Sequence, residues 1–576
     1  MVTAPSLPHR SSDFVAPTSE KQSYRGLIVF ACFIVVGLAM ISLDGPPRPL
    51  SEQAPLSTFS AARAMKHLSI IARAPHPINS PEHGAVRDYV LRALHETGLD
   101  PQVQRITGDD HGFKIEGAVE NIACRLQGSS QEKAILLVAH YDSVAAGPGA
   151  SDDGAAVAAL LETARALKLL PQLKRDIIFL FTDGEETHLL GARAFVAEHP
   201  WAKDVDVVLN FEARGIRGPS IMFETSDQNG WVIRHFGQAV SHPVANSLSY
   251  EIYKRMPNNT DFTVFRHAGY SGLNFAFIDG LAYYHTKFDS IQNIEPGSLQ
   301  HHGDYMLELA REFGNTTGDE AKSPNMIYFD VFGMALVRYS GLTGAIFLGI
   351  AAVITFAVLH IGLRTQFLRI GGCMLGLLAM VSGVAVTVLG AWLSYQAAHA
   401  MHSHRIYAGL RYHPGLYISS FCAIGLACAM ALYAGFSKKI NSLHLLMGSC
   451  LGWLALTLVM SWYFPGGTYL FLWPLLFSLF GAWLLIVEGR SAGQKVLLPL
   501  SGIPAIVIIV PLAHKIFWAF ISGSIVLVSA MLGLVMSLLI GQLGLEQTAR
   551  RWLLPVLLVS AGVALFVTAI IVSGTA

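Results

Sequence analysis

The hydrophobic pattern divides this chain of 576 residues into two halves. Residues 44 to about 335 mix polar and apolar positions as a soluble domain does, whereas most of the later chain consists of long apolar runs. Each run is close to the ~20 residues that cross the core of a bilayer, so each predicts a membrane-spanning helix. The predicted spans cover residues 336–360, 370–396, 414–436, 442–463, 467–487, 496–513, 517–541 and 552–574.

A further apolar run lies near the N-terminus, at residues 26–43. It contains no charge, follows a polar segment with three basic residues and is closed by Asp44. A cleaved signal peptide is the alternative interpretation, but the run is long for one and no small-x-small cleavage site follows it. We therefore predict a cytoplasmic tail at residues 1–25 and an uncleaved transmembrane anchor at residues 26–43.

Basic residues between the spans indicate how the chain is oriented. If residue 44 onward lies outside the cytoplasm, the loops on the inside carry most of the Lys and Arg residues, as the positive-inside rule requires. The inside loops carry Arg364, Arg369, Lys438, Lys439, Arg490, Lys495, Arg550 and Arg551, and the outside loops carry Arg405, Arg411 and Lys515. This distribution predicts a multi-pass membrane protein with an extracytoplasmic domain at residues 44–325, in a periplasm or an organelle lumen, and a membrane domain at residues 326–576.

Within the soluble half, strand-like runs alternate with helical ones. Apolar runs of strand length occupy residues 134–138, 176–182, 205–211 and 273–278, and an Ala/Leu-rich helix is expected at residues 154–170. Such alternation predicts an α/β fold, a mostly parallel sheet with helices on both faces. Ligands bind such sheets beyond the carboxyl ends of the strands, so that edge is where functional residues are expected.

The run at residues 176–182 leads directly into two adjacent acids, Glu185 and Glu186, after a glycine. A buried carboxylate without a partner costs several kcal/mol, so a bound cation would explain why a buried strand delivers two of them. One glutamate can then ligate the metal while the other takes the proton of an activated water. The alternative is a solvent-facing loop with two surface acids.

Other strand ends carry similar residues. His140 and Asp142 are two positions apart and point the same way in an extended chain, so the carboxylate can hold one imidazole nitrogen and leave the other for a metal. A histidine satisfied by a local hydrogen bond is the alternative. Asp152 and Asp153 precede a helix that either could cap; we assign Asp152 to bridging two cations and Asp153 to capping. Glu212 and a loop histidine follow the next two strands.

Together these residues resemble the M28 family of zinc metallopeptidases, and more closely its membrane-anchored branch of endoplasmic-reticulum metallopeptidases and vacuolar membrane proteases. The resemblance covers about 150 residues in the expected order. Its motifs are His140-x-Asp142, Gly149-Ala150-Ser151-Asp152-Asp153, Gly184-Glu185-Glu186, Asn210-Phe211-Glu212 and Tyr284-His285. Thr260-Asp261-Phe262 also resembles a family segment near the substrate.

The resemblance implies a zinc exopeptidase-like fold and two Zn²⁺ ions. His140 and Glu212 would serve one ion and Glu186 and His285 the other, with Asp152 bridging them. It further implies that Asp142 orients His140 and that Glu185 is the general base. For Tyr284 our own hypothesis is that it donates to the developing oxyanion, and packing is the alternative. The expected activity is that of a membrane-bound zinc exopeptidase, an aminopeptidase, which hydrolyses peptides with a di-zinc-activated water.

Three other functions are weighed against this one. A transporter would carry ionisable residues inside its spans, and these spans have almost none. A receptor-like protein with a non-catalytic peptidase-like domain would lack one of the metal-ligating residues, and none of them is missing from this sequence. Glutaminyl cyclisation would use a single zinc. The formal net charge is zero, so nothing indicates nucleic acid as a partner; peptide and lipid bilayer are the expected ones.

Four histidines lie together between two predicted spans. They are His399, His402, His404 and His413. A second metal site is conceivable there, but no acid or cysteine accompanies them, so we interpret the segment as an interfacial polar loop.

Overall fold

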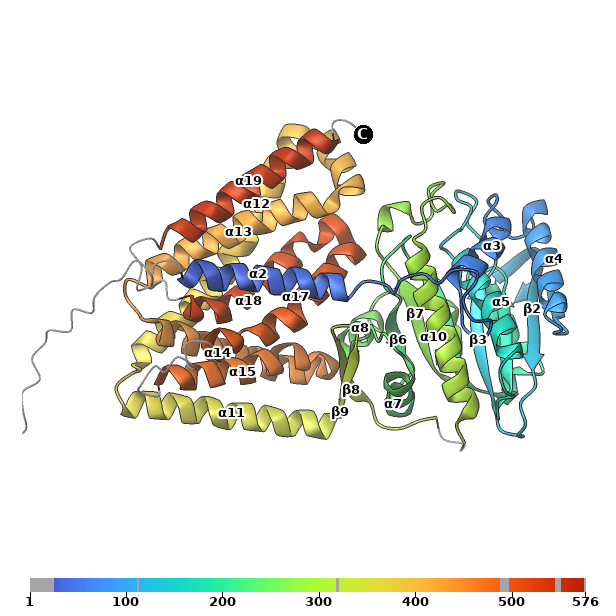
Figure 1. Cartoon of the computed structure of the whole chain (residues 1–576), viewed down its shortest axis with the longest axis horizontal. Helices are drawn as coiled ribbons and strands as arrows, with labels where there is room; N and C mark the ends of the chain where they lie inside the picture. The colour runs from blue at the N-terminus through green and yellow to red at the C-terminus, as the bar shows by residue number, and fades with distance from the viewer. Residues whose placement is uncertain (1–24, 111–112, 318–320, 487–496, 544–550, 574–576) are drawn as a thin grey trace, which may run out of the picture.

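The computed structural model describes residues 25–110, 113–317, 321–486, 497–543 and 551–573. A mixed α/β domain and a bundle of long helices lie side by side (Figure 1). The predicted tail, apart from Arg25, lies outside the described residues, as do the inside-loop residues Arg490, Lys495 and Arg550.

The α/β domain is built on one seven-stranded sheet in the order β1-β2-β4-β3-β5-β7-β6. Its four central strands are parallel to one another and correspond to the four predicted strands: β4 (Ile177–Thr182), β3 (Ala134–His140), β5 (Val205–Ala213) and β7 (Ser271–Phe277). They are buried on both faces, which is why they stand out as apolar runs.

Three outer strands, which the sequence analysis did not anticipate, pair antiparallel and make the sheet mixed. They are β1 (Gln102–Asp110), β2 (Phe113–Leu126) and β6 (Ile221–Thr225). β1 and β2 alternate apolar with polar or charged residues, a pattern typical of antiparallel strands and weaker than a continuous apolar run.

Helices cover both faces of the sheet, as predicted. One face packs on α3 (Ala61–Ile71), α4 (Pro81–Glu96), α5 (Gly154–Lys168), α7 (Gly230–Ala239) and α10 (Pro296–Asn315). The other packs on α6 (Leu190–Glu198) and α9 (Asp261–His267). The short helix α8 (Ser247–Tyr253) lies where the domain meets the bundle (Figure 1). The buried face of α5 is rich in alanine, so the helix approaches the sheet closely.

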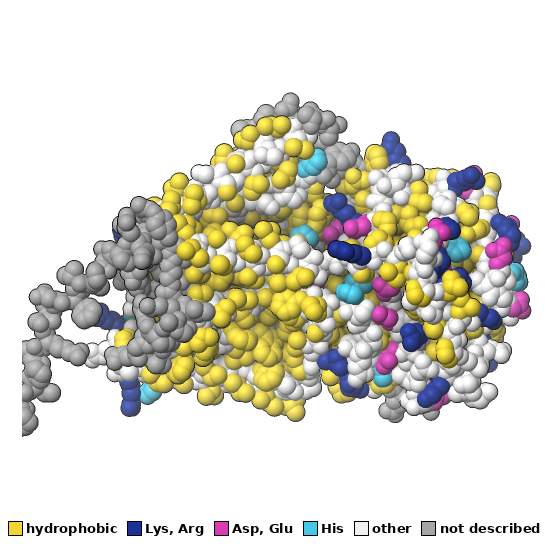
Figure 2. Space-filling view, viewed as in Figure 1, with side chains coloured by type: hydrophobic (Ala, Val, Ile, Leu, Met, Phe, Trp, Pro, Cys, Tyr) yellow, Lys and Arg dark blue, Asp and Glu magenta, His cyan; other side chains and the backbone are white. Residues whose placement is uncertain are grey.

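Nine helices among the described residues are long and apolar enough to cross a membrane, which confirms the predicted number of spans by length and composition. Their surface is dominated by hydrophobic side chains, whereas charged ones concentrate on the α/β domain and at the junction (Figure 2). The helices are α2 (Arg25–Leu43), α11 (Gly341–Arg364), α12 (Ile370–Tyr412), α13 (Pro414–Phe436), α14 (Ser442–Tyr463), α15 (Tyr469–Ile486), α17 (Ile503–Phe520), α18 (Ile525–Leu539) and α19 (Leu553–Ser573).

Two predicted loops are helical in the structure. The segment with the histidine group continues α12 to Tyr412, so these residues do not form the predicted polar loop; the side chains of residues 401–412 lie outside the described part. The predicted break at residues 514–516 lies within α17, and the chain turns later, at Ile521–Ser524. Lys515 misled the prediction because it is charged, yet its partners are buried carboxylates rather than water.

A β-hairpin joins the two halves. Its strands are β8 (Met326–Val331) and β9 (Ala335–Ser340), so the first span after the domain begins at residue 341 instead of 336. Alternate side chains point to opposite faces of a strand, and here the two faces serve different halves. Tyr328 packs into the α/β core, while Phe329 packs with the bundle helices.

Candidate metal centre

The carboxyl ends of the parallel strands bring the predicted site residues to one edge of the sheet. His140 is the last residue of β3, and Glu212 lies one residue before the end of β5. Glu185 and Glu186 follow the end of β4, and His285 lies in the loop after β7. This is the edge where open α/β sheets bind ligands.

Asp152 lies at the middle of the cluster and faces both histidines. Its Oδ1 is 3.3 Å from His140 Nε2, and its Oδ2 is 3.0 Å from His285 Nε2. Glu212 Oε2 lies 3.7 Å from the same nitrogen of His140, and Glu186 Oε1 lies 3.1 Å from that of His285. The structure therefore brings all five predicted ligands together, in two groups that share Asp152.

Asp153, which the sequence analysis assigned to capping α5, joins this cluster. Its side chain makes no cap hydrogen bond; its Oδ2 accepts the backbone N–H of His140 at 3.2 Å, and its buried Oδ1 has no hydrogen-bond partner. Ligand atoms of His140, Asp153 and Glu212 lie within 4.8 Å of one another, as do those of His140, Asp152 and Glu186. The paired acids in the sequence were the signal that could have identified Asp153.

Two buried carboxylates accept hydrogen bonds from the backbone of the two loops that carry acidic site residues. Asp289 accepts the backbone N–H groups of Ser151 at 2.7 Å and of Asp152 at 3.1 Å. Asp142 accepts those of Glu185 at 3.1 Å and Glu186 at 3.3 Å. The loop with Asp152 and the loop with Glu186 are thus each fixed by a buried acid.

The predicted orienting contact between Asp142 and His140 is also present in part. His140 Nδ1 lies 3.0 Å from the backbone carbonyl oxygen of Asp142 and 3.4 Å from its Oδ1. Nε2 therefore faces the cluster, which is the nitrogen a metal would use. Because the carboxylate also fixes the glutamate loop, Asp142 connects the ends of β3 and β4.

Three buried residues behind the site were not assigned a role from the sequence. His83, in the first turn of α4, places Nε2 2.8 Å from Asp183 Oδ1, and Asp183 immediately precedes the Gly-Glu-Glu turn. Asp183 Oδ2 also accepts the backbone N–H of Glu120 at 2.7 Å. Thr182 donates to Asp261 Oδ2 at 2.5 Å, and the other oxygen of Asp261 is buried without a hydrogen-bond partner.

The pKa shifts show how strongly negative charge is concentrated. Burial, then the charge of Glu212, raises the pKa of Glu185 well above its usual value, and burial raises the pKa of Glu212 to about 8. Burial also raises the pKa of Asp152, but the bonds with His140 and His285 outweigh this and hold it at about 2. Burial lowers the pKa of His285, yet the neighbouring carboxylates raise it to about 10.

The donor set fits zinc. Within the described residues, the ion pairs on these carboxylates are with histidines, and a buried oxygen such as Asp153 Oδ1 has no hydrogen bond to offset its desolvation. Two imidazoles with several carboxylates are typical zinc ligands. A divalent cation would neutralise charge that the protein itself leaves uncompensated.

Tyr284 lies beside this cluster. Its ring stacks on that of His285, with centroids 3.8 Å apart and an interplanar angle of 21°. Burial and the nearby carboxylates, Asp152 first among them, raise the pKa of its hydroxyl, so the phenol stays protonated at neutral pH. A protonated phenol can donate a hydrogen bond.

Comparison with known proteins identifies one peptidase family. Residues 121–310 match the model of peptidase family M28. The chain is 30% identical to endoplasmic reticulum metallopeptidase 1 of Mus musculus over 58% of this chain and 40% of that protein. It is 29% identical to the vacuolar membrane protease of Schizophyllum commune over 81% of this chain and 53% of that protein. The chain thus spans about half or less of the length of these relatives.

Solved structures are also similar to part of the chain. A zinc aminopeptidase from Bacillus subtilis is 17% identical, with a TM-score of 0.37, and the match covers 46% of this chain and 98% of that chain. Glutaminyl cyclase of Porphyromonas gingivalis is 20% identical, with a TM-score of 0.38, over 45% of this chain and all of that chain.

Proposed function

We propose that the chain is a membrane-anchored zinc metallopeptidase of family M28, an exopeptidase that acts on peptides with two zinc ions. The observation that carries the proposal is the convergence of His140, Asp152, Glu186, Glu212 and His285 at one edge of the sheet. None of these contacts is local in sequence except the one between His140 and Asp152, so stability of one loop does not explain them.

Two ions are proposed because Asp152 presents its two oxygens to two different histidines. His140 and Glu212 would hold one ion, Glu186 and His285 the other, and Asp152 would bridge them. Asp153 is a further donor on the His140 side. Bound zinc would polarise the scissile carbonyl and lower the pKa of water, the chemistry that paired metal ions supply in aminopeptidases.

Protein side chains would carry the proton and position the substrate. Glu185 is proposed as the general base that accepts a proton from the attacking water and returns it to the leaving amine. Asp142 supports this role because it fixes the backbone of Glu185 and Glu186. Tyr284, stacked on His285, is proposed to donate its hydroxyl to the developing oxyanion.

An aminopeptidase direction is proposed from the surplus of acids. Asp261 Oδ1 is buried beside the site without a hydrogen-bond partner, and Coulomb repulsion from Asp261 helps to raise the pKa of Glu185. An ammonium group at the free amino end of a peptide would be stabilised by such carboxylates. These acids therefore favour a substrate with a free amino terminus.

Carboxypeptidase action is the second candidate, and Arg214 is the observation that favours it. Arg214 lies two positions beyond Glu212, half-buried, and its side chain forms no hydrogen bond or ion pair with the described residues. An unpaired guanidinium can bind a carboxylate in a bidentate way. Blocking the two ends of a peptide separately distinguishes the two directions.

The site is proposed to face the outside of the cytoplasm. The support for this orientation is the distribution of Lys and Arg residues along the sequence, in which Lys515 lies inside α17 and not in a loop. Labelling of cysteines introduced at exposed positions of the α/β domain in intact membranes tests it. Labelling only after permeabilisation of a cell's plasma membrane alone would place the domain in the cytoplasm and contradict the proposal.

The test of the activity uses the purified full chain in nanodiscs and a peptide library with free, amino-blocked and carboxyl-blocked members. We expect hydrolysis that a chelator abolishes and zinc restores. Glu185→Gln should keep its zinc and lose at least ~10²-fold in rate, the lower range for loss of a general base. Glu198→Gln, an exposed glutamate at the end of α6, is the matched control.

Near-normal turnover by Glu185→Gln would exclude this base. Cleavage that requires a free amino end supports the aminopeptidase direction, and cleavage that requires a free carboxyl end selects the second candidate. Equal cleavage of the free, amino-blocked and carboxyl-blocked peptides would make the protein an endopeptidase.

A further inference from the structure

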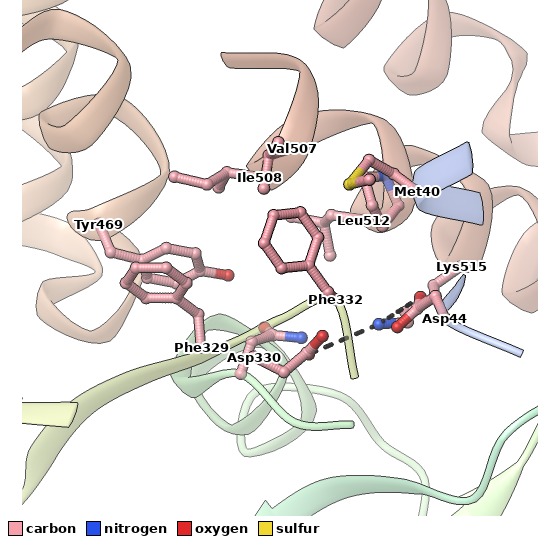
Figure 3. Close-up of a pocket in the computed structure, with 12 residues that line it drawn as sticks. Met40, Asp44, Phe329, Asp330, Phe332, Tyr469, Val507, Ile508, Leu512 and Lys515 are labelled. Atoms are coloured by element: carbon pink, nitrogen blue, oxygen red, sulfur yellow. Dashed lines mark ion pairs between the residues drawn. The ribbon is translucent and has the colours of Figure 1, made fainter. Parts of the chain in front are cut away.

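A small cavity lies where the α/β domain meets the bundle, away from the metal centre. Its walls come from the end of the anchor helix α2, the hairpin, the start of α15 and the middle of α17 (Figure 3). Its volume is about 30 Å³, enough for one or two water-sized occupants. Phe332, at the turn of the hairpin, points into its centre (Figure 3).

One side of this cavity contains a buried ion cluster. Lys515 Nζ lies 2.8 Å from Asp44 Oδ2 and 3.6 Å from Asp330 Oδ1. All three side chains are about 90% buried, with 11%, 7% and 10% of their surfaces exposed respectively. With both carboxylates ionised, these three side chains together carry a net charge of −1, which is costly for buried groups. Arg217 and Asp279, one charge of each sign, lie nearby and leave this balance unchanged when both are ionised.

The cavity also has more hydrogen-bond acceptors than this lysine satisfies. Asp44 Oδ1 is buried with no hydrogen-bond partner. Pro511 has no N–H to donate to the carbonyl of Val507 one helical turn earlier, and both residues line the cavity. The anchor helix ends at Leu43, so the negative end of its dipole adds to the charge of Asp44.

We propose that this cavity is a binding site for a small monovalent cation of the sodium type. Oxygen acceptors suit hard cations, and membrane proteins commonly bind sodium with carbonyls freed at interrupted helices. A monovalent ion balances the single surplus charge, whereas a divalent ion would leave a positive one.

The ion would connect three segments that are distant in sequence. Asp44 follows the anchor helix, Asp330 belongs to the hairpin and Lys515 belongs to α17. Asp330 in turn accepts the backbone N–H of Ala245 at 3.1 Å, which ties the cluster to the segment before α8. Binding at this point stabilises the docking of the α/β domain on the bundle, because a ligand favours the state that binds it.

The test measures thermal unfolding of the full chain in nanodiscs at constant ionic strength. Sodium chloride replaces N-methyl-glucamine chloride, a cation too large for the cavity, with a potassium chloride arm alongside. We expect the unfolding temperature to rise by about 2 °C or more as sodium approaches about 150 mM. The readout does not depend on peptide hydrolysis, so it stands or fails separately from the proposed function.

Two variants change the surplus charge in opposite directions. Asp44→Asn leaves one lysine and one aspartate, so the variant should fold without sodium and lose the sodium response. Lys515→Met leaves two carboxylates, so its sodium response should exceed that of the wild type. Asp100→Asn, an exposed aspartate after α4, is the control and should keep the wild-type response.

Three outcomes overturn the proposal. Equal stabilisation by N-methyl-glucamine would show a general salt effect. Stabilisation of the wild type on acidification alone, without a response to sodium or potassium, would mean that a proton balances the charge. An unchanged sodium response in Asp44→Asn would place any bound ion elsewhere. A larger response to potassium than to sodium keeps the site and changes only the preferred ion.

Discussion

This protein has two buried groups of acidic residues, and they differ in which positively charged groups balance their negative charge. At the edge of the sheet, Asp152, Glu186 and Glu212 form ion pairs with His140 or His285, and Asp153 lies beside them. At the junction, two aspartates share one lysine. The first group has a large surplus of negative charge and includes imidazole nitrogens. The second group has a surplus of one negative charge, and its acceptors are all oxygen atoms.

The amount of surplus charge and the type of donor atom determine which ion each site can bind. A large surplus together with nitrogen donors suits divalent zinc, whereas one surplus charge with hard oxygens suits a monovalent ion. Neither group is explained by stability alone, since an unpaired buried charge is destabilising. The comparison therefore predicts that removing one acid has opposite consequences in the two places.

The largest expected effect is at the metal centre. Asp152→Asn removes the charge that faces both histidines, so zinc content should fall and activity should drop by at least ~10²-fold. Elemental analysis of the purified variant measures the metal directly. Asp304→Asn, a substitution in α10 away from the cluster, should keep its zinc. Full zinc occupancy in Asp152→Asn would show that Asp152 does not bridge the zinc ions. The two acid groups would then not differ, because Asp44→Asn at the junction is also expected to be tolerated.

A smaller effect is expected one layer behind the metal centre. His83→Phe keeps a ring that can stack on Tyr141 but loses the contact with Asp183, which precedes the glutamate turn. Outer contacts of this kind change activity by roughly 10–100-fold, and we expect the lower end with zinc retained. The measured quantity is kcat, with KM nearly unchanged. His95→Gln, an exposed position on the same helix, is the control.

If His83→Phe lost its zinc or failed to fold, His83 would stabilise the structure and would not merely position the glutamate turn. A pH profile of kcat identical to that of the wild type, at a lower plateau, is the expected signature of altered positioning.

The smallest expected effect is at the junction. The Ser247 hydroxyl lies 2.6 Å from the carbonyl oxygen of Gly466, between α14 and α15, and 3.0 Å from that of Tyr328. Ser247→Ala should lower the free energy of unfolding by about 1 kcal/mol, the usual net contribution of a hydrogen bond. Ser249→Ala, whose hydroxyl bonds only within its own helix, should cost less. Equal destabilisation of the two variants would show that this bond does not help to hold the halves together.

Much of the fold could be predicted because its signals are local. The central strands are continuous apolar runs, and the spans are longer apolar runs, so β4 and α13 lie where the sequence placed them. The outer strands were missed because a strand such as β2 has charged residues between its apolar ones and so has no such run. The break before α18 was misplaced because a lysine in an apolar segment normally marks a loop.

The sequence by itself determined which residues lie at the strand ends, because a buried strand and the acids that follow it are consecutive in the chain. Glu186 stood out from that order, whereas His285 was named with the help of the family resemblance. Only the tertiary structure decided that Asp153 faces the cluster instead of capping a helix, and that Lys515 meets Asp44 and not water. Contacts between distant segments depend on how elements pack, and no local pattern encodes that packing.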